Sequence, residues 1–328
     1  MKIITLNLFV FLQFCSTMSA LGMETTIIEK KEKNMSTELK GRVYFYVQTT
    51  SGFMPDNSAE HYNDDTKLQV KAGYYCGQVF VYVNSNPLKM FTIGAIVNNC
   101  DLFLNRGKNS IEFRGKPESP TFVKIIQYDR PPQNAGEIQT YPFKVLAKTW
   151  LDMEKDYNKL EFNVEEPFAK ESDIIGTDGP WKFDVFENTE GAREKIKEEI
   201  RTRVKQELAA IRARDFDLYY KIQSDGEVTS VAELVAAGSP AVERMIAMTF
   251  PSGAQWPDDS YVYENLEFLF GEKTVFVYDG KAPESHYRIM HHPAYLLIGR
   301  DPKTNHTSTL SDTVFYKVNG RLKSTSDF

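Results

Sequence analysis

The sequence lacks any apolar run of eighteen residues, and its 328 residues include only three cysteines and five histidines. Without such a run, no permanent membrane-spanning helix and no stable membrane insertion are expected. A surplus of positive charge is also missing, since the net charge is -6 and the pI is about 5.6. Proteins that bind nucleic acids neutralise phosphates with Lys and Arg, so the composition argues against a nucleic-acid partner.

Common catalytic motifs are missing as well. The chain contains no nucleophile elbow, no Walker loop, no Gly-x-Gly-x-x-Gly fingerprint and no Cys-x-x-Cys pair. The widespread hydrolase and cofactor chemistries therefore have no support in the sequence, and we expect a non-catalytic protein without a cofactor.

The N-terminus has the order of a secretory signal peptide. Lys2 precedes an apolar core at 3–12, which is too short to span a bilayer, and small residues follow at 16–20. Residues 1–20 are the predicted signal peptide, with cleavage near Ala20 or one residue earlier, and the mature chain is expected to be secreted or periplasmic. Bulky and polar residues precede Cys15, which does not fit a lipoprotein anchor.

Removal of the signal peptide leaves two cysteines, Cys76 and Cys100. The β-rich runs 78–83 and 91–97 flank a turn-forming cluster, and a hairpin centred near residue 88 would place the two cysteines opposite each other. In an oxidising compartment this arrangement predicts a disulfide. The alternative is a pair of buried free thiols.

The first half of the chain reads as an all-β unit. A polar leader at 21–37 is followed, over 38–165, by short apolar runs separated by turn residues, with no helical pattern among them. Each such strand has one apolar face that a second sheet must cover, so the pattern predicts a β-sandwich. The expected strands are 42–48, 67–71, 78–83, 91–97, 102–104, 109–114, 121–128, 141–148 and 159–164.

The second half changes its periodicity after an irregular linker at 166–188. Apolar residues at 196, 200, 204, 208 and 211 lie on one face of a predicted helix over 190–214, with Thr189 as its N-cap. Strands follow, and Asn319-Gly320 indicates a type I′ hairpin. The fold class is therefore two-domain, with the sandwich followed by an α+β unit at 189–328. Its expected strands are 261–270, 273–279, 286–298, 311–318 and 321–326.

Two stretches resemble known families. The strand-turn-strand of Leu102–Phe113 is similar to jelly-roll and immunoglobulin-like accessory modules of exported proteins, some of which bind carbohydrate. The Ala-rich helix end at Leu208–Asp217 and the closing strands at Phe315–Leu322, taken with the order of helices before strands, resemble the NTF2-like superfamily. That resemblance implies helices packed on a curved antiparallel sheet, in the shape of a cone.

His286 and His292 are the candidate catalytic residues. They have the same parity along one predicted strand, so both can face a cone pocket near Asp279 or Glu284, where a histidine and a carboxylate could act as general acid and base. Ordinary strand histidines are the alternative, because no metal-binding spacing is present.

Two further sets of residues are candidate binding sites. Asp56, Asp64 and Asp65 belong to an oxygen-rich loop that could hold Ca²⁺, although the loop lacks the usual spacing and an ordinary solvated loop is the alternative. Aromatic residues of the second unit could line a ligand pocket or fill its core. These candidates are Tyr219, Trp256, Tyr263 and Tyr295.

The function predicted from these observations is extracytoplasmic binding of a ligand, such as a carbohydrate or a small apolar molecule, or of a protein partner, by an exported soluble protein. The rival hypothesis is an enzyme that uses His286 or His292 in the cone. A homodimer through the C-terminal sheet is a third possibility, because an exposed strand face often has to be covered.

Overall fold

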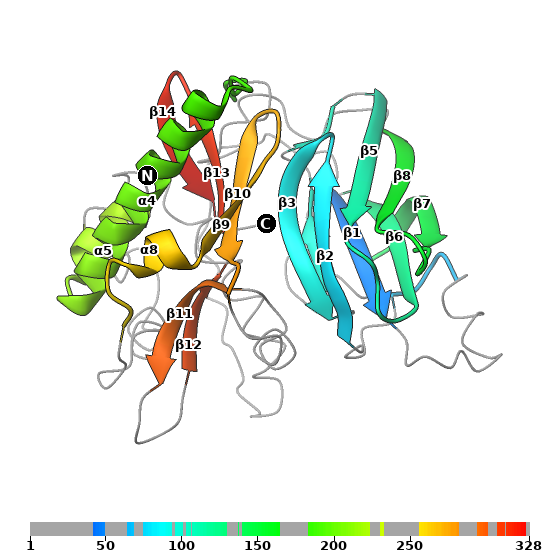
Figure 1. The fold of residues 1–328 in the computed structure, drawn as a ribbon. Coiled ribbons are helices and arrows are strands. Elements are labelled where there is room, and N and C mark those ends of the chain that lie inside the picture. Colours follow the sequence, from blue (N-terminus) through cyan, green and yellow to red (C-terminus); the bar gives the residue numbers. More distant parts are fainter. Residues whose placement is uncertain are drawn as a thin grey trace, which may run out of the picture.

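The computed structural model describes 42–49, 64–68, 75–93, 96–100, 103–105, 107–129, 137, 140–164, 183–223, 230–232, 256–281, 294–300, 307–311 and 313–325. This part of the chain is mostly antiparallel β-sheet, with three helices (Figure 1). The β-rich fold class expected from the sequence is confirmed at this level.

Two four-stranded sheets form the N-terminal half. The first sheet has the strand order β4-β1-β6-β7 and the second has the order β3-β2-β5-β8. The chain passes from one sheet to the other five times, and of the connections between consecutive strands only β2–β3 and β6–β7 stay within one sheet. The bounds are β1 Arg42–Thr49, β2 Tyr75–Val83, β3 Asn86–Ile93, β4 Ile96–Asn99, β5 Gly107–Arg114, β6 Thr121–Tyr128, β7 Phe143–Trp150 and β8 Tyr157–Val164.

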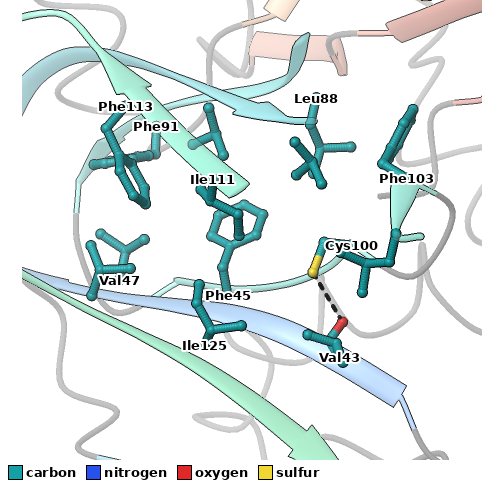
Figure 2. Close-up of a cluster of buried hydrophobic side chains, with 14 of the residues drawn as sticks. Val43, Phe45, Val47, Leu88, Phe91, Cys100, Phe103, Ile111, Phe113 and Ile125 are labelled. Atoms are coloured by element: carbon teal, nitrogen blue, oxygen red, sulfur yellow. Dashed lines mark hydrogen bonds between the residues drawn. The ribbon is translucent and has the colours of Figure 1, made fainter. Parts of the chain in front are cut away.

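The inner faces of these two sheets enclose one hydrophobic core. Figure 2 shows Phe45 of β1 and Ile125 of β6 facing Phe91 of β3 and Phe113 of β5, and all four side chains are buried. This is the period-2 pattern of a sandwich, in which alternate residues of each strand point inward.

The predicted disulfide between Cys76 and Cys100 is wrong in this structure, where both are buried free cysteines. The β2–β3 hairpin turns at Asn84-Ser85, with Val83 opposite Asn86, and not near residue 88. Cys76 therefore stays in the second sheet, while Cys100 follows β4 of the first sheet and directs its Sγ to the Val43 carbonyl, 3.4 Å away (Figure 2).

The C-terminal half contributes helices and two further sheets. The third sheet has the order β14-β13-β10-β9, and β11 pairs only with β12 among the described strands. The bounds are α4 Glu190–Arg212, α5 Phe216–Gln223, α8 Tyr261–Glu264, β9 Leu266–Phe270, β10 Thr274–Asp279, β11 Ala294–Arg300, β12 Thr307–Ser311, β13 Thr313–Val318 and β14 Arg321–Thr325.

Helix α4 begins and packs as its sequence predicts. The Thr189 hydroxyl caps it by accepting a hydrogen bond from Ala192 N at 3.3 Å, and all five residues of the predicted apolar face are buried. They pack against Val275 and Val277 of β10 and Phe315 of β13. One face of the third sheet is therefore covered by α4.

The opposite face of the third sheet packs on the sandwich. Phe276 and Tyr316 belong to the sandwich core, and the Phe276 ring lies 6.5 Å from that of Phe80 on β2. Phe183 bridges the two parts, because it stacks on Tyr316 at 4.2 Å and meets Phe103 at 6.3 Å. The third sheet is thus a middle layer between α4 and the sandwich (Figure 1).

Several predicted elements differ from those observed. The predicted strand 91–97 is two strands in different sheets, and 261–270 begins as the short helix α8 before β9. By contrast, β6 coincides with the predicted 121–128, and Asn319-Gly320 forms the predicted turn with φ values of 52° and 74°.

Candidate functional site

The aromatic candidates do not form a common pocket. Tyr219 is 6% exposed, and both it and the partly buried Trp256 belong to the core beneath α4. Tyr263 is 50% exposed on α8, where Lys205 Nζ lies 2.9 Å from its hydroxyl and Arg201 stacks on its ring. Tyr295 lies on β11, and its side chain is outside the described set.

The candidate catalytic histidines His286 and His292 lie outside the described residues, as does Asp56. Asp279, the carboxylate considered as their partner, is 2% exposed at the end of β10. Its Oδ2 accepts the Tyr261 hydroxyl at 2.7 Å and its Oδ1 accepts Lys281 N at 2.9 Å. These contacts tie α8 to β10.

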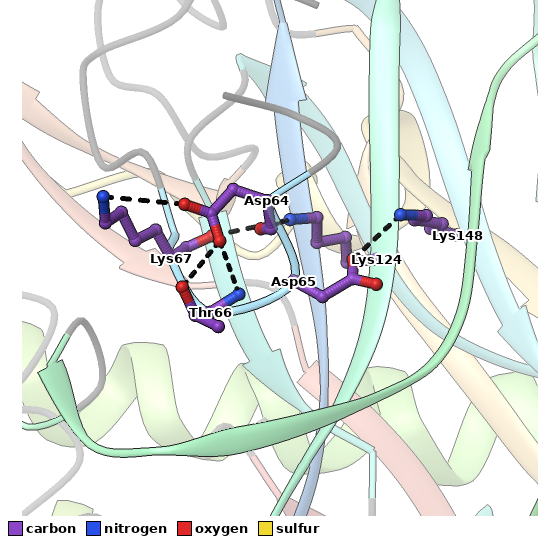
Figure 3. A network of polar contacts seen from close by, with 6 residues as sticks. All are labelled: Asp64, Asp65, Thr66, Lys67, Lys124 and Lys148. Atoms are coloured by element: carbon purple, nitrogen blue, oxygen red, sulfur yellow. Dashed lines mark hydrogen bonds and ion pairs between the residues drawn. The ribbon is translucent and has the colours of Figure 1, made fainter. Parts of the chain in front are cut away.

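The acidic loop is engaged by its own neighbours (Figure 3). Asp64 accepts the Thr66 hydroxyl at 2.6 Å and the Thr66 amide at 2.9 Å, and these bonds hold the pKa of its carboxyl below the ordinary value. Asp65 pairs with Lys148 at 2.9 Å. Across the described ranges, no three His, Cys, Asp or Glu side chains come together as a metal site.

A buried lysine of the first sheet forms a hydrogen bond to the same loop. Lys124 of β6 is 1% exposed and donates from Nζ to the Asp64 carbonyl at 2.7 Å. Burial lowers the pKa of this lysine. The loop thereby covers an aromatic outer face of the first sheet that includes Tyr44, Tyr46 and Tyr128. The contacts of Asp64 and Asp65 therefore have a structural role, because they hold this loop against the first sheet.

A groove of about 680 Å³ lies where α4, α5 and β14 meet. Its apolar lining consists of Leu218 and Ile222 from α5 and Leu322 from β14. Leu218 is 43% exposed, although leucine side chains are usually buried. The groove is therefore an open hollow with an apolar strip, and a ligand can reach it from solvent.

The walls of the groove are charged. Lys195, Glu198, Glu199 and Arg203 line it from α4, and Lys221 lines it from α5. Both of these glutamates are already paired, Glu198 with Arg201 at 2.6 Å and Glu199 with Lys317 at 2.7 Å. The acidic side chains of the wall are therefore neutralised by cations that lie outside the lining.

Arg203 fixes the geometry of the groove. It is 9% exposed, its Nε lies 3.3 Å from Glu207 Oε1, and its Nη2 donates to the Ile222 carbonyl at 2.8 Å. A guanidinium that binds the last carbonyls of a helix satisfies acceptors that have no partner within that helix. Arg203 thus holds the C-terminal end of α5 against α4.

Sequence reasoning missed this groove because three elements from different parts of the chain build it. The sequence feature that could have indicated the groove is Leu218, an apolar residue between Asp217 and Tyr219 in the first turn of a helix. Asp215 accepts Leu218 N at 3.0 Å and so sets where α5 begins, which in turn decides where Leu218 points.

Comparison with known proteins gives no relative: the chain matches no protein-family model, no curated protein and no solved structure. Among the helices of the described residues, none has the length and apolarity needed to cross a membrane.

Proposed function

We propose that the chain is an exported, non-catalytic protein that binds a partner in the groove between α4, α5 and β14. The observation that carries this proposal is the open apolar strip of Leu218, Ile222 and Leu322 within charged walls. Binding sites combine apolar area with a few polar groups that orient the ligand, and this groove has both. The signal-peptide pattern of residues 1–20 supports export.

We also propose that residues 38–165 are a sandwich domain and that 189–328 form an NTF2-like unit. Support for the second assignment comes from α4 lying over one face of an antiparallel sheet, after which the strands follow in the chain. In this arrangement the groove belongs to the helix-covered side of the unit.

Native mass spectrometry of the protein purified from the medium or periplasm of its own host tests the proposal. We expect a chain that begins near residue 21 and carries additional non-covalent mass. Leu218→Asp should remove that mass, because a charge in the apolar strip disfavours binding, while an acidic residue in the first turn of α5 is compatible with the helix.

Val185→Asp is the matched control, since Val185 is 61% exposed and does not line the groove. It should retain the additional mass. Equal occupancy in both variants would place the ligand elsewhere, and a chain that keeps residues 1–20 would contradict export.

A further inference from the structure

Strand β14 is an edge strand of the third sheet, since among the described strands it pairs only with β13. Val318 and Arg321 flank the two-residue turn and close the hairpin as its first hydrogen-bonded pair. In an antiparallel pair, hydrogen-bonded and non-hydrogen-bonded positions alternate. Leu322 and Ser324 therefore direct their backbone N–H and C=O groups away from β13, toward the side of β14 on which no described strand pairs.

The same two residues face the groove side of the sheet. Leu322 is opposite Lys317 and Ser324 is opposite Phe315. Lys317 pairs with Glu199 of α4, and Phe315 packs in the core under α4. Partners in register share a face, so the side chains of Leu322 and Ser324 lie on the α4 side. A chain segment added along β14 would run beside the apolar strip of the groove.

The charge around this edge is positive. Lys195 lines the groove beside three ion pairs, in which Arg201, Arg203 and Lys317 pair with Glu198, Glu207 and Glu199. Strand β14 adds the exposed cation Arg321 at its start. Residues 166–328 as a whole have 20 basic and 27 acidic side chains, so this basic surface stands out from an acidic surrounding.

We propose that an acidic, extended segment of a partner protein binds by adding a strand to β14, with its apolar side chains in the groove. This inference rests on the proposed function and names the partner for that site. Main-chain pairing supplies affinity in strand addition, and pockets for alternate side chains supply specificity. A second copy of this chain is disfavoured as the occupant, because two basic edges would repel each other.

Fluorescence anisotropy with labelled octapeptides tests the mode of binding. We expect a peptide that alternates valine and glutamate to bind about tenfold or more tightly than one that alternates valine and lysine, and the difference to shrink at high salt. Equal binding of the two peptides would overturn the acidic partner. No binding of either would overturn strand addition, and the mass spectrometry of the groove variants would still report on the proposed function.

Ser324→Pro tests the pairing itself, because proline removes an N–H that points to the free edge and leaves the β13 pairing intact. It should weaken the glutamate peptide about tenfold. Ser324→Ala, which keeps the N–H, should bind as the wild type does. Unchanged binding by a folded Ser324→Pro variant, together with loss of binding in Leu218→Asp, would reject strand addition and retain the groove.

Amide hydrogen exchange in the wild-type chain gives a second readout if Ser324→Pro does not fold. The amides of Leu322 and Ser324 should exchange quickly in the free protein and become protected by the glutamate peptide. Those of Arg321 and Lys323 should be protected already. Protection that does not change at positions 322 and 324 would overturn the proposal, and so would a dimer of the free chain with these amides already protected.

Discussion

Gly271 lies against the β2–β3 turn of the sandwich, and replacing it with alanine tests whether the third sheet and the sandwich pack together. A Cβ atom at this position would lie 2.5 Å from Pro87 Cδ, 2.8 Å from Asn86 Cα and 2.8 Å from the Ser85 carbonyl oxygen. Two of these atoms are backbone and the third belongs to a proline ring, so none can rotate aside. Gly271→Ala must therefore push the β2–β3 turn and the third sheet apart.

The expected cost is about 1–3 kcal/mol of unfolding free energy, the range for forcing extra volume into a packed site. The displacement also strains the bond from Lys273 N to Asn86 Oδ1, which is 2.8 Å long and joins the same two parts. Urea denaturation followed by far-UV circular dichroism measures the change as a lower midpoint with an unchanged slope.

Gly191→Ala is the matched control. Gly191 lies in the first turn of α4, and beyond its chain neighbours and the adjoining helix backbone no atom is within 4 Å of the position that its Cβ would occupy. This substitution should stabilise the chain by about 0.4–1 kcal/mol, because alanine limits the unfolded chain and favours the helix. A Gly271→Ala protein as stable as the wild type would refute the contact between the third sheet and the β2–β3 turn.

Three other predictions concern buried polar groups. Arg203→Met should lower the unfolding free energy by about 3–5 kcal/mol in urea titrations, since it removes an ion-pair partner of Glu207, which is 1% exposed; a loss no larger than for Glu207→Gln would contradict this. Because Cys76 and Cys100 are buried and burial raises the pKa of the Cys76 thiol, neither should react with Ellman's reagent until urea is added, and rapid labelling of the native protein would be the contrary result. Burial raises the pKa of Tyr220 to about 12, so the unfolded chain loses this proton near pH 10 while the folded chain keeps it; stability should fall as the pH rises from about 10 to 12, and less so in Tyr220→Phe.

Local patterns predicted the elements whose structure depends on nearby residues. The spacing in α4 and the Asn319-Gly320 turn needed no knowledge of distant contacts. The β2–β3 turn was misplaced because Asn84 and Ser85 adopt positive φ values of 48° and 67°. Serine is not among the residues that favour this conformation. The cluster at 84–87 was identified as turn-forming, but the hairpin was centred near residue 88, and this error carried into the disulfide prediction.

The sequence of β10 indicates that the third sheet is buried on both of its faces. The run Thr274–Val277 is buried at every position, so β10 is covered on both faces and does not alternate between core and solvent. The identity of the covering layers depends on contacts such as that of Phe183 with Tyr316. Pairings across more than 100 residues leave no local pattern to read.

A sheet covered on both faces can pair with another chain only along its edges. In the third sheet, β9 is one edge, and it contacts β3 of the sandwich as well as following α8. The other edge is β14, which lies beside the groove and has no strand next to it among the described residues. The layer order that buries the sheet therefore also leaves β14 as the edge at which a partner strand can add, and the basic side chains around it favour an acidic one.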